Sequence, residues 1–444
     1  MSLPRYPTYK DSGVAWLGEV PRHWSHGRLR WLARRYSGGT PDKANLDYWE
    51  GGTIPWLNSG AVNDRLIVEP STFITEAAFA SCSAKWIPSG ALVMALAGQG
   101  KTKGMVAQLA IATTCNQSMA AIIPGNVVAS RYLYWWLESN YQNIRNMAGG
   151  DLRDGLNLDL LGDIPCPLPA RLEQLAIAAF LDRETAKIDV LVAEQERMVE
   201  LLQEKRQALI SHAVTKGLNP DASMRDSGIG WLGAVPTHWE VVGLTKYIDS
   251  VVDYRGRTPT KVEEGPFLVT ARNIRDGKID YSTSEEFIPE SEYEDVMRRG
   301  KPEVGDVLFT TEAPLGQVAN VDRTDVALAQ RIIKFRGRPS MLNNYFLKYW
   351  MMGAFCHADM IRLATGSTAL GIKGSKVVQL RLCLPPLPEQ VAIARHLDRQ
   401  VEQLDALIAE ARSAMYLLQE RRTALISAAV TGQIDVRGIG ASDA

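Results

Sequence analysis

The stretch "KDSGVAWLGEVPRHW" (10–24) returns as "RDSGIGWLGAVPTHW" (225–239), and ten of the fifteen positions are identical. More matched strings follow both copies in the same order: "GGTP" (38–41) and "RGRTP" (255–259), "PSGALVMA" (88–95) and "EVGDVLFT" (303–310), "RYLYWWL" (131–137) and "YFLKYWM" (345–351), "LLQEKRQALIS" (201–211) and "LLQERRTALIS" (417–427). Repetition over this length indicates a duplicated structural unit. The 444 residues therefore form two copies of one unit, enough chain for two or more domains.

The composition is that of a globular protein, with 46% hydrophobic and 22% charged residues and a net charge of −1. No apolar run approaches the roughly 20 residues of a membrane-spanning helix, and the N-terminus lacks the apolar core of a signal peptide. The five cysteines are widely spaced and form no CxxC pair, so neither a disulfide framework nor a zinc site is indicated. We expect a cytoplasmic protein.

Each unit begins with a segment rich in Gly, Pro and aromatic residues, which we call the first head (1–165) and the second head (223–382). Short β-branched runs such as "RLIVE", "AAIIP", "FLVTA" and "RIIKF" predict strands between turns. "SRYLYWWLES" and "NYFLKYWMMG" carry large apolar residues at three- and four-residue spacing, which predicts one helix per head.

After each head, a proline-rich hinge leads into 43 residues without Pro or Gly, 173–215 and 389–431. Apolar residues recur there every seven positions, as in a coiled coil. The predicted seam consists of Leu181, Ile188, Gln195, Leu202 and Leu209 in the first segment and Leu397, Leu404, Ala411, Leu418 and Leu425 in the second. Each helix would be roughly 65 Å long. In an antiparallel pair Gln195 and Ala411 would meet; the alternative is two helices that each pack on their own head.

The predicted fold class is therefore α+β, with two repeated mixed α/β domains separated by a long antiparallel two-helix coiled coil. The expected boundaries are 1–165 for the first head, 166–222 for the first hinge and helix, 223–382 for the second head, and 383–444 for the second hinge, helix and tail.

Signatures of catalysis are missing from the sequence. It contains no HExxH motif, no GxSxG elbow, no dinucleotide fingerprint and no NPPY-type element for base methylation. His23 and His238 belong to the duplicated "PxHW" and are interpreted as turn or packing residues, because a lone His beside Trp is seldom a ligand. We predict no catalytic residue and no metal site.

"ALAGQGKT" (95–102) fits a relaxed phosphate-loop pattern. A true site needs a strand before the loop and a helix after it, but "KGMVAQLAIATTC" (103–115) predicts another strand. The matching stretch "TTEAPLGQVAN" (310–320) loses the GKT, so variable basic surface is the favoured interpretation and ATP binding the alternative.

The resemblance that these residues carry is to the specificity subunit of Type I restriction–modification enzymes. It rests on "LPPLPEQVAIARHLDRQVEQLDALI" (384–408), its first copy and the duplicated "DSGxxWLGxVPxHW", and it covers nearly the whole chain. One departure is the pair Ala170-Arg171 in place of the more usual Pro386-Leu387.

The resemblance implies a non-catalytic DNA-reading subunit. Each head would read one half of a split asymmetric target, and the helices would set the spacer and dock two methyltransferase subunits. Motor–nuclease (restriction) subunits would join to cleave DNA. S-adenosylmethionine, ATP and Mg would bind these partners, leaving this chain without a cofactor of its own.

Candidate DNA contacts are polar residues in loops that differ between the copies, since side chains that reach base edges carry specificity. They are Asn58, Ser59, Lys101, Lys103 and Gln117 in the first head, and Thr270, Arg272, Asn273, Arg331 and Lys373 in the second. The heads are only slightly basic, with 15 Lys+Arg against 13 Asp+Glu in 1–165 and 21 against 20 in 225–384. Tight binding is therefore expected to need the partners' surfaces. The rival function is a coiled-coil adaptor whose heads bind proteins.

The repeat also makes a prediction about the ends of the chain. "HAVTKGLNPDASMRDSG" (212–228) carries the first helix into the second head, "AAVTGQIDVRGIG" (428–440) matches its start, and "YPTYKDSG" (6–13) matches its finish. The two termini should therefore meet beside the first head.

Overall fold

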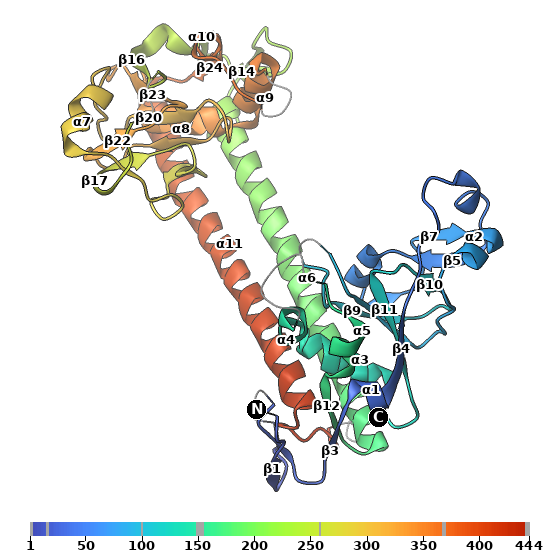
Figure 1. The fold of residues 1–444 in the computed structure, drawn as a ribbon. Coiled ribbons are helices and arrows are strands. Elements are labelled where there is room, and N and C mark those ends of the chain that lie inside the picture. Colours follow the sequence, from blue (N-terminus) through green and yellow to red (C-terminus); the bar gives the residue numbers. More distant parts are fainter. Residues whose placement is uncertain are drawn as a thin grey trace. The chain divides into compact units, whose positions relative to one another are not determined.

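The computed structural model describes residues 3–14, 17–98, 101–147, 155–256, 259–365 and 370–439. The chain divides into two compact units, and neither is a single stretch of sequence. Unit 1 contains 1–194 and 414–444, and unit 2 contains 195–413. Figure 1 shows the fold of each unit.

Unit 1 holds the first head, whose main sheet has the strand order β4-β11-β8-β9-β6 and whose smaller sheet has the order β10-β5-β7. The pairs β1–β2 and β12–β3 complete it. The strands are β1 (Tyr9–Asp11), β2 (Glu19–Pro21), β3 (Ser25–Arg28), β4 (Ala33–Ser37), β5 (Ile54–Leu57), β6 (Leu66–Ile67), β7 (Thr72–Ile74), β8 (Leu92–Ala95), β9 (Val106–Leu109), β10 (Thr114–Cys115), β11 (Met119–Pro124) and β12 (Pro165–Leu168). The helices are α1 (Leu29–Leu32), η1 (Leu46–Tyr48), η2 (Ser59–Asn63), α2 (Glu76–Ser81), α3 (Ser130–Ser139), α4 (Tyr141–Asn146) and α5 (Leu158–Gly162).

Unit 2 repeats this plan with a main sheet of order β16-β23-β20-β21 and a parallel pair β17–β22, and the pairs β13–β14, β15–β24 and β18–β19 surround them. The strands are β13 (Met224–Asp226), β14 (Ala234–Pro236), β15 (Glu240–Gly243), β16 (Ile248–Asp253), β17 (Val262–Val269), β18 (Ile274–Arg275), β19 (Lys278–Ile279), β20 (Val307–Thr310), β21 (Val318–Asn320), β22 (Val326–Leu328), β23 (Ile332–Gly337) and β24 (Arg381–Leu384). The helices are η3 (Leu244–Tyr247), α7 (Glu290–Val296), α8 (Asn344–Met352), α9 (Ala354–Leu363) and α10 (Gly374–Val377).

The predicted secondary structure is confirmed where it was specific. α3 and α8 match the two aromatic segments, because their large side chains are buried against the main sheets. The runs around Ile67, Ile122, Leu268 and Ile333 are strands. α6 (Arg171–Lys216) and α11 (Leu387–Val430) match the two segments without Pro or Gly.

The two long helices are antiparallel within each unit. In unit 1 Asp189 of α6 pairs with Arg422 of α11, with 3.0 Å between Oδ1 and Nε. In unit 2 Arg206 of α6 pairs with Asp405 of α11, at 2.9 Å between Nε and Oδ1. Residue 206 lies 17 positions after residue 189 on α6, and its partner 405 lies 17 positions before 422 on α11. The two ion pairs therefore belong to one antiparallel register. None of the ten predicted seam residues is exposed.

Each long helix ends in the core of the other unit. Ile426, Ala429 and Val430, at the end of α11, belong to the core that surrounds Trp24 and Leu181 in unit 1. The matching residues of α6, Ile210, Ala213 and Val214, belong to the core around Trp239 in unit 2. The boundaries drawn from the sequence assign each long helix to the head that precedes it. The observed helix ends agree instead with the predicted antiparallel pair and with the predicted meeting of the chain ends beside the first head.

The duplicated "HW" explains why the opening stretch recurs. Trp24 is fully buried, and its Nε1 donates a hydrogen bond of 3.0 Å to Glu173, in the first turn of α6. His23 Nε2 lies 3.0 Å from the same carboxylate. In the second head Trp239 and His238 contact Glu389 of α11 at 3.1 and 2.9 Å. The motif therefore attaches the start of each head to the start of its own long helix, consistent with the predicted packing role of the histidines.

The glutamine after each of these glutamates holds a second segment of the head. Gln174 accepts from the Ala129 amide at 2.7 Å, just before α3. Gln390 accepts from the Asn343 amide at 2.8 Å, just before α8. The repeated Glu-Gln thus fixes two parts of each head against one helical turn, because buried polar side chains need hydrogen-bond partners.

The chain ends meet inside unit 1, which confirms that prediction. The Asp435 amide donates to the Pro4 carbonyl at 2.8 Å, and the Tyr9 hydroxyl donates to the Gly432 carbonyl at 3.1 Å. Gly432 has φ +74°, and a Cβ there would lie 2.3 Å from Pro21. Glycine is therefore needed where the chain leaves α11 and crosses the first head.

Candidate nucleic-acid interface

In the first head, one edge of the smaller sheet gathers polar side chains. β5 and β10 are parallel, with Trp56 opposite Thr114 and Leu57 opposite Cys115. Asn58 and Gln117 follow the carboxyl ends of these two strands, and the Asn116 amide donates to the Leu57 carbonyl at 2.9 Å. Both predicted side chains are exposed, so the structure brings Asn58 and Gln117 to one edge.

Neighbouring segments complete this edge. The Asn58 side chain caps η2 by accepting from the Gly60 amide at 2.8 Å, which leaves its amide group exposed, and Ser59 is partly exposed on the first turn of η2. The Asn58 backbone amide donates to Ser71 Oγ at 3.1 Å. The Thr40 hydroxyl donates to Gln117 Oε1.

Close backbone contact holds the edge together. A Cβ on Gly38 would lie 1.9 Å from the Cys115 carbonyl oxygen, so the "GGTP" loop passes directly over the end of β10. The Gly39 amide donates to this carbonyl at 2.9 Å. Burial raises the pKa of the Cys115 thiol to about 12, so Cys115 is a neutral part of the support beneath the edge.

The second head has the same edge with different side chains. β17 and β22 are parallel, and the Ala329 amide donates to the Val269 carbonyl at 2.9 Å, the counterpart of the bond at Asn116. Thr270 follows β17, while Arg331 comes three residues after β22. Arg331 has φ +79° and pairs with Glu312 at 3.0 Å, with about half of its side chain exposed.

Arg272 and Lys373 are both exposed. Lys373 follows Ile372, whose amide donates to the Thr311 carbonyl at 2.9 Å, and the Thr311 amide donates to the Arg331 carbonyl at 2.8 Å. These bonds bring Lys373 close to Arg331. The second edge therefore carries three cations, Arg272, Arg331 and Lys373, of which Arg331 is paired with Glu312, whereas Asn58 and Gln117 make the first edge neutral.

Two predicted contacts need correction. Asn273 is fully buried: its Oδ1 accepts from the Thr270 amide and hydroxyl at 2.9 and 2.8 Å, and its amide donates to the Asp280 and Ser284 carbonyls. Every hydrogen-bonding position is used inside the loop, so Asn273 shapes the edge without presenting itself to a ligand. Lys103, three residues before β9, is only 4% exposed. The sequence alone could not distinguish a buried residue that supports the loop from an exposed residue that a ligand can reach.

The "ALAGQGKT" segment is the connection of a hairpin. β8 and β9 pair antiparallel, and no helix follows the segment before β9. Gln99 and Gly100 lie outside the described residues. β20 and β21 form the equivalent hairpin in the second head. A phosphate loop needs a helix after the glycines, so the structure does not support the nucleotide-binding alternative. Lys101 is exposed near the hairpin end.

The sequence candidates omitted Thr40, Ser71 and Arg255. Arg255 lines a hollow of the second head with Lys373 and pairs with Asp253 at 3.0 Å. Thr40 and Arg255 belong to the duplicated "GGTP" and "RGRTP", and this repeat was the signal that could have found them. Ser71 had no signal in the sequence, because its place depends on the pairing of β7 with β5.

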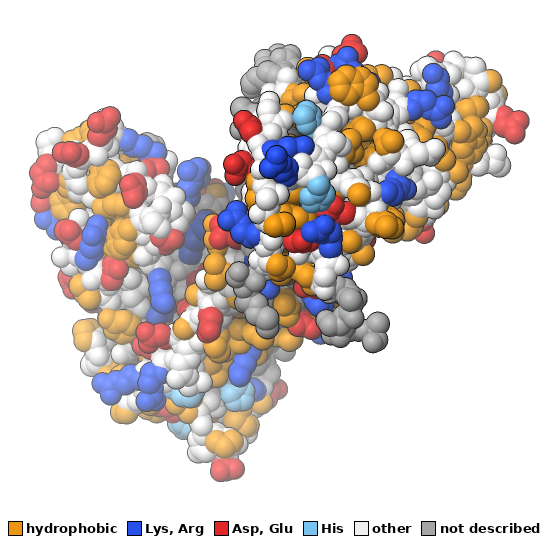
Figure 2. All heavy atoms as spheres, turned by 90° about the horizontal axis from the view of Figure 1, so that it is seen from below, with side chains coloured by type: hydrophobic (Ala, Val, Ile, Leu, Met, Phe, Trp, Pro, Cys, Tyr) orange, Lys and Arg blue, Asp and Glu red, His pale blue; other side chains and the backbone are white. Residues whose placement is uncertain are grey.

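Charges of both signs are mixed on the face shown in Figure 2. No group of His, Cys, Asp and Glu that could hold a metal ion occurs among the residues the structure describes. In the same residues, no helix is long and apolar enough to cross a bilayer.

Similarity to known proteins agrees with this geometry. The family model of the Type I restriction modification DNA specificity domain matches residues 21–199 and 260–413. The MjaVIII specificity subunit of Methanocaldococcus jannaschii is 23% identical over 69% of this chain and 71% of its own length. The EcoKI specificity subunit of Escherichia coli K12 is 20% identical over 94% of this chain and 90% of its own length.

Two solved structures share the fold. A chain from work on complex assembly and conformational transition of the type I R-M system aligns with a TM-score of 0.68 at 17% identity, covering 93% of this chain and 98% of that one. The HsdS subunit of Thermoanaerobacter tengcongensis aligns with a TM-score of 0.50 at 18% identity, over the same shares. The duplicated heads, the paired long helices and the matched family model lead to one conclusion: the chain belongs to the family of Type I restriction–modification DNA specificity subunits.

Proposed function

We propose that each head reads one half of a bipartite, asymmetric DNA target through the edge formed by its parallel strand pair. The observation that carries this proposal is the shared edge with different side chains: Asn58 and Gln117 in one head, Arg272 and Arg331 in the other. Asn and Gln pair well with adenine, and Arg pairs well with guanine, so the two edges should prefer different bases.

The paired long helices would fix the distance between the half-targets. Their single antiparallel register in both units supports a regular spacer, because a seam in constant register gives a defined rise per residue. The outer faces of the helices would dock two methyltransferase subunits, and restriction subunits would join that complex. The similarity to specificity subunits of Type I restriction enzymes supports this assembly.

This chain would contribute recognition and no catalysis. S-adenosylmethionine would bind the methyltransferase subunits, and ATP and Mg would bind the motor subunits. The near balance of charge in the two heads supports a chain that needs its partners' basic surfaces to close around a duplex.

A gel-shift experiment with the reconstituted methyltransferase complex tests the proposal. We expect one bipartite sequence, found by selection from random duplexes, to bind at least about 1,000-fold more tightly than unrelated DNA at physiological salt. Scrambling either half should remove this preference. A coiled-coil adaptor would show equal affinity for all duplexes, and that result would reject DNA reading by the heads.

A further inference from the structure

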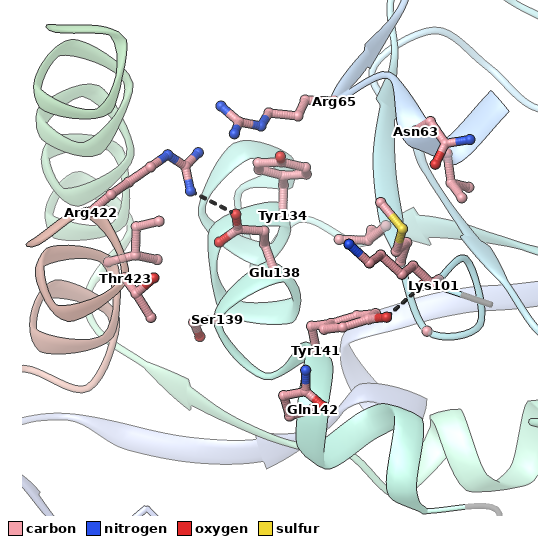
Figure 3. Close-up of a pocket in the computed structure, with 15 residues that line it drawn as sticks. Asn63, Arg65, Lys101, Tyr134, Glu138, Ser139, Tyr141, Gln142, Arg422 and Thr423 are labelled. Carbon is pink, nitrogen blue, oxygen red and sulfur yellow. Dashed lines mark hydrogen bonds and ion pairs between the residues drawn. The ribbon is translucent and has the colours of Figure 1, made fainter. Parts of the chain in front are cut away.

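A pocket of about 540 Å³ lies within unit 1 (Figure 3), and it is lined in part by Val62 and Asn63, at the end of η2. α3, α4, the β8–β9 connection and the end of α11 form its walls. Its polar lining includes Arg65, Lys101, Tyr134, Glu138, Tyr141 and Arg422. Pockets of this volume are typical of sites for small ligands and peptide ends.

Two buried donors in this pocket have no partner among the described residues. Tyr134 is fully buried, and its hydroxyl makes no hydrogen bond. The Arg422 side chain is 11% exposed; its Nε and Nη1 pair with Asp189 and Glu138, both at 3.0 Å, but its Nη2 has no acceptor. Buried donors of this kind are nearly always satisfied in native proteins, so an acceptor is expected here.

Unit 2 shows what such an acceptor looks like. Arg206, the repeat counterpart of Arg422, also forms an ion pair with a helix aspartate, Asp405, although its Nε makes no hydrogen bond there. Its Nη2 donates at 2.7 Å to the main-chain carbonyl of Asp276, in the turn between β18 and β19. In unit 1 the corresponding segment around Asn63 only lines the pocket. The repeat therefore favours a carbonyl oxygen as the acceptor for Arg422 Nη2.

The charges favour a neutral group deep in the pocket and an anion at its mouth. Glu138 and Asp189 are already paired with Arg422 and Arg65, which balances the deep charges. Burial raises the pKa of Tyr134 to about 12, so its hydroxyl remains a donor at neutral pH. The exposed Lys101 side chain extends into the pocket in Figure 3, and no described residue pairs with its ammonium group.

The remaining wall is apolar. Val62, Met105, Val106 and Ile426 line the pocket next to these donors. An apolar side chain placed there would gain about 25 cal/mol for each Å² of its surface removed from water. An amide carbonyl, an apolar side chain and a carboxylate are the three groups found together at the end of a polypeptide.

We propose that this pocket binds a peptide carboxyl terminus that ends in an apolar residue. The last amide carbonyl accepts from Arg422 Nη2 and Tyr134 Oη, the side chain packs on Met105 and Ile426, and the carboxylate faces Lys101. Either the C-terminus of a partner chain or a free N-acylated amino acid supplies this chemistry. The proposal does not depend on DNA reading by the heads.

Ligand-observed NMR with the full chain tests this site, and the probe is N-acetyl-L-leucine. A ligand of about a dozen heavy atoms should bind with about millimolar affinity. Its amide, which lacks the carboxylate, should bind about 3- to 10-fold more weakly, because it loses one charge-assisted contact. Equal binding of the two compounds would overturn the proposed orientation.

Tyr134→Phe provides the sharpest variant. Because the Tyr134 hydroxyl has no partner in the free protein, the variant should fold with unchanged stability yet bind the probe about 2- to 10-fold more weakly, the range of one neutral hydrogen bond. Tyr132→Phe is the matched control. The Tyr132 hydroxyl donates to the Pro167 carbonyl at 3.0 Å, so this variant should lose stability and keep its affinity for the probe.

Peptide length separates the two sources. Acetylated peptides of four and eight residues that end in leucine should bind progressively more tightly if a partner's C-terminus is the ligand. Affinity that stays at the level of N-acetyl-L-leucine identifies a free acylated amino acid. No saturable binding of any probe, or binding unaffected by both Tyr134→Phe and Lys101→Ala, would reject the site.

Discussion

The residue that follows the left-handed glycine differs between the two heads: Ala91 follows Gly90 in the first, and Asp306 follows Gly305 in the second. Ala91 is 2% exposed and Asp306 is 1% exposed, so the same buried position is apolar in one head and charged in the other. The flanking strands keep one register, β8 with β11 and β20 with β23.

The strand next to this position also differs between the two heads. Asp306 accepts from Lys334 at 3.0 Å and from Arg336 at 2.7 Å, both on β23. The equivalent positions on β11 are Ala121 and Ile123, which pack in an apolar core. The backbone frame therefore does not depend on the chemistry of this core. What the two heads share are the contacts to the long helices, and what distinguishes them are the buried cluster and the exposed edge.

Lengthening the shared frame should have the largest effect. One extra heptad after Gln195 and another after Ala411 keep the seam in register and add roughly 10 Å, about three base pairs of DNA. Three base pairs also turn the distant half-target by roughly 100°. We expect the variant to fold but to lose about 4 kcal/mol or more of binding free energy at the original target, the scale that separates specific from non-specific binding.

Mapping of methylated adenines in cells that carry this lengthened chain measures the effect. Surviving sites should keep both half-sequences with a spacer longer by about two to four base pairs, from the same rise per residue. Full methylation at the original spacer would show that the helices do not set the distance.

Breaking the buried cluster of the second head comes next. Asp306→Ala should lower the free energy of unfolding by about 3–5 kcal/mol, because it leaves buried cations without their carboxylate. The triple variant Asp306→Ala, Lys334→Ala, Arg336→Ile copies the first head and should be less destabilised. Hydrogen exchange at the amides of β20 and β23 measures both variants, with β8 and β11 as the internal reference. A triple variant as unstable as the single one would refute the equivalence of the heads.

The same cluster makes the second head sensitive to acid. Burial alone would raise the pKa of Asp306, but hydrogen bonds from Arg336, the Glu303 amide and Lys334 lower it below its ordinary value. A carboxylate whose pKa falls on folding stabilises the fold above its unfolded value, and this contribution is lost as the pH falls through the folded value. At pH values below about 4, the amides of β20 and β23 should therefore be less protected from hydrogen exchange. The triple variant should lose this part of the pH dependence.

A smaller difference is expected at the shared helix contacts. The Glu173 side chain is 5% exposed and accepts from Tyr6 at 2.6 Å as well as from Trp24. The Glu389 side chain is 28% exposed and, among the described residues, forms hydrogen bonds only with His238 and Trp239. Glu173→Ala should cost about 3 kcal/mol and Glu389→Ala about 1.5 kcal/mol. Urea denaturation measures the free energy of unfolding of each variant, and hydrogen exchange at the amides of unit 1 and unit 2 shows which unit is destabilised. A larger loss of stability for Glu389→Ala than for Glu173→Ala would contradict the role of burial.

The smallest effects are expected at the edges. Gln117→Ala and Arg331→Ala should each cost about 1–3 kcal/mol of discrimination at one base and relax specificity in different halves of the target. Lys101→Ala, outside both edges, should leave the preferred sequence unchanged. Selection from random duplexes gives the preferred sequence of each of the three variants. If Gln117→Ala and Arg331→Ala changed the same half of the target, the two edges would not be independent.

Periodicity in the sequence was enough to predict the long helices, α3, α8 and the meeting of the chain ends, because these follow from local patterns and from the repeat. The candidate edges were predicted only in part. Asn58, Gln117, Arg272 and Arg331 are exposed, but Asn273 is buried, since an amide that satisfies four bonds within its own loop looks no different in sequence. The pocket at Tyr134 depends on tertiary contacts that no local pattern encodes.

Exchange of a whole head tests the central claim most directly. Residues 226–382 would be replaced by the corresponding head of a relative with a different target, which keeps the hinge at Pro386 and both long helices. Mapping of methylated adenines across the genome should then show one new half-sequence, the other half unchanged and the same spacer. A change in both halves would contradict the account, because it would mean that the two heads read DNA jointly and not as two divergent copies on one frame.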